Sequence, residues 1–532
     1  MPVQNLIESI KSTTTTDLFI LFTATCIATY VFNFYYKYFT RPNPLPGPFP
    51  LPFIGNSHNY RDVKKFYEEC QQKYGDICEL MLDRRYIILS RPEDIRKLFT
   101  PTQFFQRIPD SPGIIELGMY NHAIIFNENY ESWNYNKRFF TEALSTRFID
   151  ASMISINQIY EEMCGYWQSL GRHSASMNNN NNWTLETDFS GWFHTFSNDV
   201  TSVLATGTRT HAITSFYNTL SINKVELSNA LIQDGTDFCK ALVKFLEGFL
   251  FFTFFSPFVR HYVPIFKSKS DSYLKNRDYL FNKFDNMIKQ RRTEIEEKPE
   301  TRTKTDMLTS LITAHTVVEG ENFKPMSDAN IRMNLLEMFI GGSDTTADTF
   351  CFIVYFLCKH PDVKEKMLAE IDSIVPTFSD KLSYNDLKRL KYCDAIIKEA
   401  SRLIPAVPFA FRHIMTECKI AGYQWPAGTS FHINFAGGHI HPVSWDNPKT
   451  FNPDRWLSNY NGNIDKAAWM PWGGGKRICP GKNLAIIELL LVMSSLYKNY
   501  NVELVNEHGP LKIHTQIIAI CTELKVRISP RI

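Results

Sequence analysis

The sequence predicts a mainly α-helical protein with a small β region near its N-terminal side and an apolar membrane anchor at its N terminus. Two long segments, 330–359 and 483–497, place apolar residues at helical spacing. Two short runs, 77–82 and 86–90, flank a polar turn and are expected to pair as strands. The stretch 18–36 contains no charged residue, which is typical of a segment that enters a membrane.

The composition argues against a nucleic-acid binder and indicates a reducing environment. The chain has 532 residues, and 57 basic against 55 acidic residues leave a net charge of +2. Such a balance provides no basic surface for nucleic acid. The 11 cysteines form no Cys-x-x-Cys pair and no regular framework. This is the pattern of reduced thiols in a cytosol-facing domain.

The segment 18–36 is predicted to be a transmembrane anchor that follows a short N-terminal tail, residues 1–17. Its 19 residues just suffice to cross the hydrocarbon core of a bilayer. A cleaved signal peptide is the alternative, but the apolar run is longer than a signal core and no small-residue cleavage site follows it. Lys37 and Arg41 come directly after the segment, so the positive-inside rule places the rest of the chain in the cytosol.

A proline-rich hinge, residues 37–52, is predicted between the anchor and a globular domain, residues 53–532. Five prolines stand between residues 42 and 50. Each proline fixes φ and disfavours helix in the residue before it. We therefore expect a stiff, extended spacer at this point.

The first part of the globular domain is expected to alternate short helices with loops. Helical spacing predicts a helix at 63–74, and Arg91-Pro92-Glu93-Asp94 is expected to start another. The segment 104–126 contains two prolines and two glycines and is predicted to be a long loop that borders a pocket. The charged segment 283–305 is expected to form a solvated helix and loop.

The segment 242–264 is dense in phenylalanine. Packing in the protein core is one interpretation. A surface that dips into a membrane or admits substrate is the other.

The long apolar segment 330–359 is interrupted by Gly341, Gly342 and the polar residues that follow them. Glycines and polar side chains are poor choices in the middle of a buried helix, because the polar side chains compete for backbone hydrogen bonds. A kink with satisfied polar groups is one interpretation. The other is a gap for a ligand and water, in which Thr345 holds dioxygen and a water and Asp344 relays protons from the surface.

The stretch 471–481, Pro-Trp-Gly-Gly-Gly-Lys-Arg-Ile-Cys-Pro-Gly, places Cys479 in a tight loop just before a predicted helix. The glycines permit backbone angles and close approach that a side chain would block, and the helix N terminus favours a thiolate. A thiolate in such a loop suits the axial position of a haem iron, and Arg477 could reach a haem propionate as a charged fork. A buried free cysteine in a turn is the alternative.

Two of these segments resemble motifs of the cytochrome P450 family. The pattern from Trp472 to Gly481, aromatic-x-x-Gly-x-Arg-x-Cys-x-Gly, is similar to the haem-binding signature of that family, with Trp472 where the family usually has Phe. Residues 341–346, Gly-Gly-Ser-Asp-Thr-Thr, resemble its oxygen-activation motif. The order of the two motifs along the chain is that of the family.

Two further motifs stand between them in the expected order. Glu399-Ala400-Ser401-Arg402 resembles the Glu-x-x-Arg motif of the family, and residues 451–456 resemble the segment that supplies a second arginine, here Arg455. The resemblance implies that Glu399, Arg402 and Arg455 form a buried triad that holds the proximal side of the haem pocket. Its role would be structural, and loss of one member would strand a buried charge.

The resemblance covers roughly residue 42 to the C terminus and implies the cytochrome P450 fold. That fold is a large helical domain with a long central helix, the I helix, and a small β-rich region, so residues 53–532 would be the catalytic domain. The implied cofactor is haem b with the Cys479 thiolate as axial ligand of the iron. Asp344 and Thr345 are the implied catalytic pair.

The resemblance also implies contacts with the haem propionates and the haem surroundings. Trp133 and Lys137 share one face of a predicted helix at i and i+4. The family normally has Arg at the second position, and lysine lacks its bidentate fork. Arg138 stands next to Lys137, and which of the two points inward stays open; a solvated basic helix face is the alternative. The other implied contacts are Arg412, Arg477, Trp472 and Gly475, and pocket walls are expected at 407–410 and 515–519.

The function implied by the resemblance is that of a monooxygenase which inserts one atom of O2 into an apolar small molecule. Electrons would come from an NADPH-cytochrome reductase through its flavins, with cytochrome b5 as a further candidate donor. The location would be the endoplasmic reticulum membrane, with a single span and the catalytic domain facing the cytosol. Two alternatives stay open: a haem-thiolate isomerase or dehydratase that rearranges a peroxide, and a non-catalytic haem-binding or ligand-sensing protein.

Overall fold

The computed structural model describes residues 14–59, 62–99, 104–143, 146–174, 183–318, 321–375, 382–460, 462 and 464–531. Most of the predicted tail, residues 1–17, therefore lies outside the described residues.

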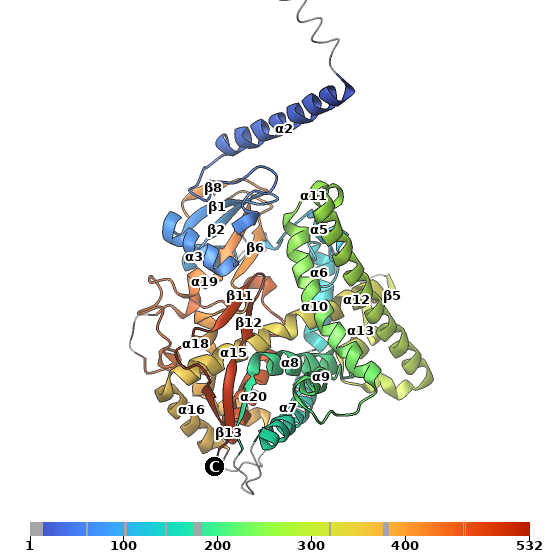
Figure 1. Ribbon diagram of the computed structural model, residues 1–532, viewed down its shortest axis with the longest axis vertical. Helices are drawn as coiled ribbons and strands as arrows, with labels where there is room; N and C mark the ends of the chain where they lie inside the picture. Colours follow the sequence, from blue (N-terminus) through green and yellow to red (C-terminus); the bar gives the residue numbers. More distant parts are fainter. Residues whose placement is uncertain are drawn as a thin grey trace, which may run out of the picture.

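Helices dominate the described chain (Figure 1). They are α2 (Thr15–Phe39), α3 (Val63–Tyr74), α4 (Pro92–Lys97), α5 (Pro112–Glu116), α6 (Tyr130–Ala143), α7 (Thr146–Ser174), α8 (Phe189–Thr206), α9 (Ala212–Leu220), α10 (Asn229–Phe254), α11 (Pro257–Tyr262), α12 (Pro264–Glu297), α13 (Met307–Thr313), α14 (Asp328–Gly342), α15 (Asp344–Lys359), α16 (Pro361–Ile374), α17 (Tyr384–Arg389), α18 (Lys391–Leu403), α19 (Phe435–His439) and α20 (Lys482–Asn499).

The strands form small sheets. They are β1 (Ile77–Met81), β2 (Arg85–Leu89), β3 (Leu185–Asp188), β4 (His315–Val318), β5 (Glu321–Pro325), β6 (Phe409–His413), β7 (Cys418–Ile420), β8 (Tyr423–Trp425), β9 (Ser430–Asn434), β10 (Tyr500–Leu504), β11 (Lys512–Thr515), β12 (Ala519–Glu523) and β13 (Lys525–Pro530).

The largest sheet lies near the anchor and has the strand order β1-β2-β9-β6 (Figure 1). The predicted strand pair is confirmed: β1 and β2 pair antiparallel with Ile77 opposite Leu89. β9 then runs parallel to β2 and antiparallel to β6. The end of β6 carries Arg412, so this sheet places one of the predicted site residues against the helical body.

Helix α2 emerges from the globule as a separate rod (Figure 1). Thr14 and Asp17 cap its start with reciprocal hydrogen bonds. It is the one described helix that is long and apolar enough to cross a membrane, and none of its most apolar stretch is buried in the protein. The helix continues to Phe39, three residues into the predicted hinge, because no proline occurs between Thr15 and Pro42.

The core of the helical body is built around α14 and α15, which follow one another with a break at Ser343. The sequence predicted one long helix, 330–359, with a weak point at the glycines, and the break occurs there. α15 packs against α8, α18 and α20. Because neighbours surround it, its apolar residues are buried on nearly all sides rather than along one stripe.

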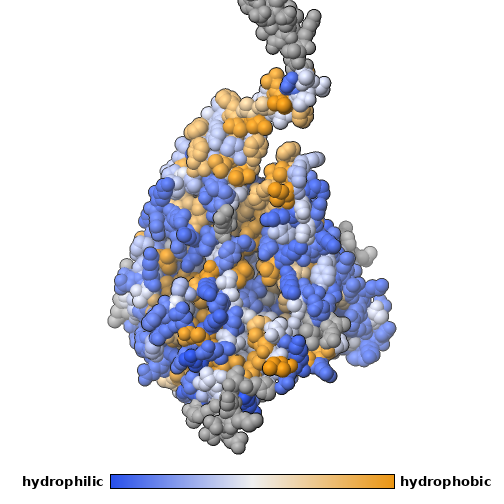
Figure 2. All heavy atoms as spheres, in the orientation of Figure 1, coloured by the Kyte–Doolittle hydropathy of each residue, from blue (hydrophilic) through white to orange (hydrophobic). Residues whose placement is uncertain are grey.

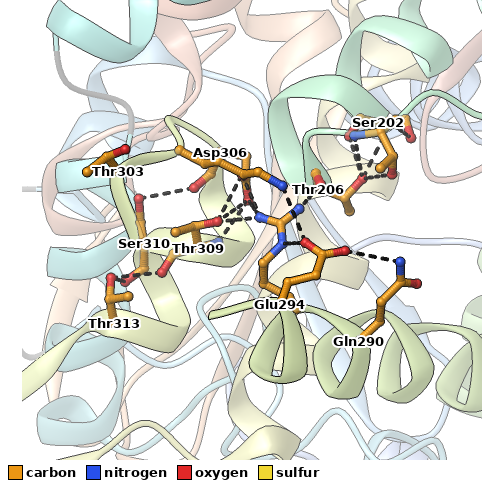
Figure 3. A network of polar contacts seen from close by, with 12 residues as sticks. Ser202, Thr206, Gln290, Glu294, Thr303, Asp306, Thr309, Ser310 and Thr313 are labelled. Carbon is orange, nitrogen blue, oxygen red and sulfur yellow. Dashed lines mark hydrogen bonds and ion pairs between the residues drawn. The ribbon is translucent and has the colours of Figure 1, made fainter. Parts of the chain in front are cut away.

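A buried ion network joins α12, α13 and α8. Figure 3 shows Asp306, Thr309, Glu294 and Thr206 around one guanidinium group, that of Arg291. Arg291 Nη1 lies 2.7 Å from Asp306 Oδ2, and both side chains are buried. The expectation of a solvated helix and loop at 283–305 is therefore only partly correct, because one face of α12 is part of the core.

The segment 242–264 was interpreted either as core or as a surface that contacts a membrane or substrate, and its phenylalanines differ in their exposure. Phe249, Phe251, Phe252 and Phe254 are buried on α10. Phe258 on α11, by contrast, is 64% exposed. Figure 2 shows apolar side chains gathered at the end of the molecule from which α2 emerges. The exposed apolar residues of α11, of the start of α12, of the hinge and of the first position after the hinge are Phe258, Tyr262, Ile265, Phe49, Leu51 and Phe53.

Candidate active site

One large cavity opens inside the helical body between α14, α15 and the loop that precedes α20. Its volume is about 390 Å³, and its total empty space, including the mouth that opens to solvent, is about 2290 Å³. α10, β6 and the 104–128 segment complete the walls. The predicted walls contribute as expected, since Val407, Ala410 and Ile517 line the cavity. The 104–126 segment borders it too, although the segment also contains the short helix α5.

The cysteine loop owes its shape to its glycines. Gly475 has φ +60°, and a Cβ atom there would lie 2.2 Å from the carbonyl oxygen of Phe99. Glycine is therefore needed where the loop presses on Phe99. Gly475 itself does not line the cavity, and its place in the haem surroundings stays a prediction.

Cys479 presents its sulfur to the cavity from a hydrogen-bonded turn. Its N–H donates to the carbonyl oxygen of Trp472 at 2.9 Å, and both residues line the cavity. Burial raises the pKa of the Cys479 thiol, while the N–H groups of Gly481 and Lys482 and the charge of Arg107 act in the opposite direction. The start of α20 thus directs backbone donors toward the sulfur, as expected for a helix N terminus.

Thr345 lies on the α15 wall of the same cavity. Its hydroxyl donates to the carbonyl oxygen of Gly341 at 2.7 Å, a bond that the break at Ser343 leaves available. Asp344 is the first residue of α15 but does not line the cavity. Burial raises the pKa of its carboxyl group, although the charge of His194 opposes the shift. The acid and the alcohol are therefore neighbours in the chain on different sides of the helix.

Three arginines, two buried and one half-buried, concentrate positive charge at one side of the cavity. Arg477, Arg412 and Arg107 all line it. Burial lowers the pKa of Arg412 to about 9 and that of Arg477 to about 8, and in each case the charge of Arg107 adds to the effect. Glu128 faces the cluster but lies 3.9 Å from Arg477 Nη2. The cluster thus holds more cations than nearby carboxylates.

The three arginines differ in how many of their donors are already used. Arg477 donates to the carbonyl oxygens of Phe105 at 3.2 Å, Ile124 at 2.6 Å and Asn127 at 2.5 Å. Arg412 donates from Nη1 to the carbonyl oxygen of Phe411 at 2.7 Å. Arg107 donates to Ile125 at 3.0 Å, and its buried Nε has no partner among the described residues.

The helix α6 settles which of two neighbouring cations faces inward. Lys137 lines the cavity, donates to the carbonyl oxygen of Lys476 and lies 4.9 Å from the centre of the Trp133 ring. Arg138 is exposed and does not line the cavity. The alternative contact through Arg138 therefore loses its geometric basis. Trp133 is buried and lines the cavity beside Arg477.

Two buried glutamates in the cavity wall were not found from the sequence. Glu337 on α14 accepts hydrogen bonds from the N–H groups of Ile124 and Ile125, and burial raises its pKa to about 8. Glu488 on α20 accepts one from Ser197 at 3.1 Å, and burial likewise raises its pKa to about 8. Acidic residues inside apolar helical segments were the available signal. Arg107 lies in a loop, and the sequence contained no signal that pointed to it.

The ion triad lies outside the cavity and is fully buried. Glu399 accepts hydrogen bonds from Arg402 Nε and Arg455 Nε, each at 2.9 Å. Trp456 Nε1 donates to the same carboxylate at 2.9 Å, a partner that the sequence did not reveal. Arg402 continues to the carbonyl oxygens of the 439–450 segment, and so holds this segment against α18.

The cavity fits the haem that the sequence motifs imply. A sulfur faces the cavity from one wall, an unpaired guanidinium nitrogen of Arg107 is buried beside it, and the excess of cations matches a group with two carboxylates. Apolar side chains of α10 and the 104–128 segment leave space for a small organic molecule next to this set. No residue that lines the cavity conflicts with the binding of haem, a flat ring that carries two carboxylates.

Comparison with known proteins gives consistent results. The sequence profile of the family described as cytochrome P450 matches residues 45–528. Cytochrome P450 3A17 of Cavia porcellus is 25% identical over 471 residues, covering 88% of this chain and 87% of its own. The (+)-vincadifformine 19-hydroxylase of Catharanthus roseus is 25% identical over 496 residues and covers 89% of each chain.

Solved structures share the fold. The haem domain of cytochrome P450DA superposes with a TM-score of 0.74 at 21% identity, covering 92% of this chain and 98% of its own. A cyanobacterial relative with retinoic acid bound gives a TM-score of 0.72 at 21% identity, covering 92% and 99%.

Proposed function

Since the chain belongs to the cytochrome P450 family of haem monooxygenases that act on small molecules, we propose that it is a membrane-anchored member fed with electrons by an NADPH-dependent reductase. One observation carries the proposal: Cys479 and Thr345 line the same cavity from two different walls. A sulfur ligand and a hydroxyl on the opposite side of a shared space are what reductive activation of dioxygen requires.

Cys479 is the proposed axial ligand of the haem iron. Haem, when bound, supplies the redox chemistry that activates dioxygen, and a thiolate ligand favours O–O cleavage. The N–H groups of Gly481 and Lys482 favour the thiolate over the thiol. Trp472, whose carbonyl oxygen accepts the Cys479 N–H, is the aromatic residue proposed to cover the thiolate.

Arg107, Arg412, Arg477 and Lys137 are the proposed partners of the haem propionates. Arg412 and Arg107 have more unused donors than Arg477, which already holds three carbonyl oxygens. We therefore assign Arg477 a double role: it holds the 104–128 segment in place and adds positive charge. Charge-assisted hydrogen bonds in a buried site are roughly twice as strong as neutral ones.

Thr345 and Asp344 are the proposed proton-handling pair. The Thr345 hydroxyl reaches the cavity and can donate a hydrogen bond to a water or to dioxygen there, with the Gly341 carbonyl as its resting acceptor. Asp344, the preceding residue, is half-buried on the other side of the helix, and it is the proposed group that relays protons from the surface. This pair favours a monooxygenase over a peroxide isomerase, which consumes no protons.

The proposed location is the endoplasmic reticulum membrane, with the catalytic domain in the cytosol. Helix α2 is of spanning length and is not packed in the globule. The exposed apolar residues of α11 and the hinge lie at the same end of the molecule (Figure 2). Membrane contact at that end would bring apolar substrates to the enzyme. The reductase, and cytochrome b5 as a further candidate, would approach from the cytosol.

The proposal is tested by the spectrum of the reduced protein with carbon monoxide. We expect the long-wavelength Soret band that thiolate ligation produces, its loss in Cys479→Ala, and its retention in Cys418→Ala, a matched change of a half-buried cysteine remote from the cavity. The same band in Cys479→Ala would show that the ligand is misassigned. Product formation from a hydroperoxide without any reductase would favour the isomerase instead.

A further inference from the structure

We propose that Glu79, on β1, clamps the end of the membrane anchor to the sheet β1-β2-β9-β6, so that tilting of α2 in the bilayer stops at the clamp and does not disturb the cavity. The clamp consists of Glu79, Arg41 and Arg85, and none of these three residues lines the cavity. The inference goes beyond the reaction proposed above, and it rests on the assignment of α2 as the anchor.

The clamp is centred on one buried carboxylate. The Glu79 side chain is 2% exposed. Arg85 Nε donates to its Oε2 at 2.9 Å, and Arg41 Nε donates to its Oε1. The N–H of Leu45 also donates to Oε2, at 3.3 Å. The donors therefore come from three places: the residues just beyond α2, the hinge and β2.

The two arginines also hold the backbone around the carboxylate. The carbonyl oxygens that accept their Nη donors are those of Pro42 and Asn43 for Arg85, each at 2.6 Å, and those of Tyr38 and Leu45 for Arg41. The guanidinium carbon of Arg41 lies 4.0 Å from the centre of the Tyr38 ring, within the range of a cation–π contact. Because Tyr38 lies in the last turn of α2, the clamp holds both the end of the helix and the start of the hinge.

Beyond the clamp, the hinge is fixed to the surface of the sheet. Asn43 turns the chain with φ +47°, a conformation that asparagine adopts more readily than most residues, and its side chain donates to the carbonyl oxygen of Gln424 at 2.7 Å. The carbonyl oxygen of Pro46 accepts the N–H of Glu79 at 3.1 Å. A Cβ atom at Gly47 would lie 2.2 Å from the Glu79 carbonyl oxygen. The chain after Asn43 therefore moves only together with the strands beneath it.

The ring contacts of the anchor outside the clamp are weaker, because they are exposed. Tyr30 stacks on Phe53 with ring centres 4.3 Å apart, but the two residues are 43% and 48% exposed. Such rings can exchange each other for lipid, whereas opening the clamp would strand a buried carboxylate without its cations. Tilting of α2 therefore breaks the ring contacts first. The sheet, whose strand β6 carries Arg412 to the cavity, stays in place.

The alternative is that these contacts only stabilise the hinge on the sheet. Both roles predict a looser sheet when Glu79 is replaced. They differ in the effect of the membrane: a merely stabilising contact loosens the sheet by the same factor in every bilayer, whereas a clamp against tilting matters more when α2 is tilted further. Helix α2 has 25 residues and is therefore about 37 Å long, so a thinner bilayer tilts it more.

The test measures amide hydrogen exchange of the full-length protein in thin vesicles of dilauroyl phosphatidylcholine and in thick vesicles of dierucoyl phosphatidylcholine. In the parent, β1, β2 and β6 should exchange at the same rates in both. In Glu79→Gln, these strands should exchange about tenfold faster or more in the thin bilayer than in the thick one. Arg41→Gln, which leaves Glu79 paired with Arg85, should show a smaller difference of the same sign. Glu93→Gln, at an exposed carboxylate paired with Arg91, should behave like the parent.

Two results would overturn the proposal: an equal acceleration of exchange in both bilayers for Glu79→Gln, or exchange in the parent that already depends on bilayer thickness. If Glu79→Gln does not fold, rates in Arg41→Gln that are the same in both bilayers would overturn it as well. Release of the parent from both kinds of vesicle by carbonate would refute the assignment of α2 as the anchor, on which the inference rests. Exchange rates require neither haem nor turnover, so a failure of the proposed reaction is recognised separately.

Discussion

Arg477 shows how much a single side chain in the cavity wall can do. Three of its donors hold the carbonyl oxygens of Phe105, Ile124 and Asn127. The N–H groups of Ile124 and Ile125 are held in turn by Glu337. One arginine, two residues before the cysteine, thus connects the cysteine loop to the distal helix α14 through the 104–128 segment.

The first prediction separates this bracing role from cofactor binding. Arg477→Gln should lower the free energy of unfolding by at least about 2 kcal/mol, because buried carbonyl oxygens lose their donors. Arg107→Gln removes one hydrogen bond, to the Ile125 carbonyl, and should cost only about 1 kcal/mol, but it should reduce haem retention, since its buried Nε has no partner among the described residues. Urea unfolding and haem content after dialysis measure the two effects. Arg138→Gln, at an exposed site, is the control. Equal effects of Arg107→Gln and Arg477→Gln on both quantities would contradict the assignment.

The second prediction concerns the buried carboxyl group of Glu488. Its pKa is about 8 in the folded protein and 4.5 in the reference state, so the folded state binds the proton more tightly. The stabilisation is fully present below about pH 4.5 and is lost as the pH rises through about 8. The slope is about 1.4 kcal/mol per pH unit.

Glu488→Gln should remove this slope. Measured between pH 5 and pH 8, the unfolding free energy of the parent should fall relative to that of the variant by about 1.4 kcal/mol per pH unit. Glu523→Gln, at a surface carboxylate whose pKa is lowered by Lys512, should leave the slope in place. Parallel curves for parent and Glu488→Gln would show that Glu488 is not protonated in the folded protein.

At the scale of elements, the protein joins its parts through buried ionic centres. The Glu399 carboxylate ties α18 to the 446–456 segment. The Arg291 network ties α12 to α13 and α8 (Figure 3). Neither centre lies in the cavity, yet each fixes an element that does contribute to its wall. The cavity shape therefore depends on contacts that take no part in the chemistry.

The third prediction tests the triad. Glu399→Gln leaves Arg402 and Arg455 without a charge partner, and such a change should cost roughly 3–5 kcal/mol. Trp456→Phe removes one hydrogen bond to the same carboxylate and should cost about 1 kcal/mol. Thermal and urea unfolding measure both. A smaller loss in Glu399→Gln than in Trp456→Phe would mean that the hydrogen bond, rather than the charge, stabilises this region.

Sequence patterns predicted helices and strands well where a single local property of the sequence determined them. The strand pair, the helix at 63–74, and the weak point at Gly341 and Gly342 were all visible, because alternation, helical spacing and helix-breaking residues act locally. Helix α5 was missed, since five residues that begin Pro-Gly give no periodicity. The ends of the anchor were displaced by a few residues, because only the position of Pro42 limits the helix.

The residues of the site were predictable to the extent that motifs carry them. Cys479, Arg477 and Thr345 all line one cavity, and the sequence had marked each. Arg107, Glu337 and Glu488 were not marked, because their importance arises only when distant segments meet. Arg138 was an open alternative that only the rotation of α6 could decide, since two adjacent residues point in different directions from a helix.

At the scale of the whole molecule, the anchor and the globule are nearly independent. Among the described residues, the contacts between them are local. Tyr30 stacks on Phe53, Tyr35 and Tyr38 pack on Phe49, and Arg41 pairs with Glu79 at the foot of the hinge. The proline-rich hinge continues onto the sheet β1-β2-β9-β6. Motion of the anchor should therefore not reach the cavity.

The fourth prediction follows from this independence. A chain that lacks residues 1–36 keeps Tyr38, Arg41 and the hinge, so it should bind haem and show the same carbon monoxide spectrum as the full chain. The shortened chain should no longer be an integral membrane protein. The exposed apolar residues of α11 and the hinge should still bind it to the membrane surface, from which salt or mild detergent releases it. Carbonate extraction measures this. Retention of the shortened chain as an integral protein would contradict the assignment of α2 as the anchor.

The central claim is that Cys479 binds the iron of a haem inside this cavity. X-ray absorption at the iron edge of the purified protein tests it most directly, because it counts the sulfur atoms bound to the metal. One sulfur in the first coordination shell, lost in Cys479→Ala and kept in Cys418→Ala, is the predicted result. A first shell of nitrogen and oxygen alone in the parent protein would contradict the account.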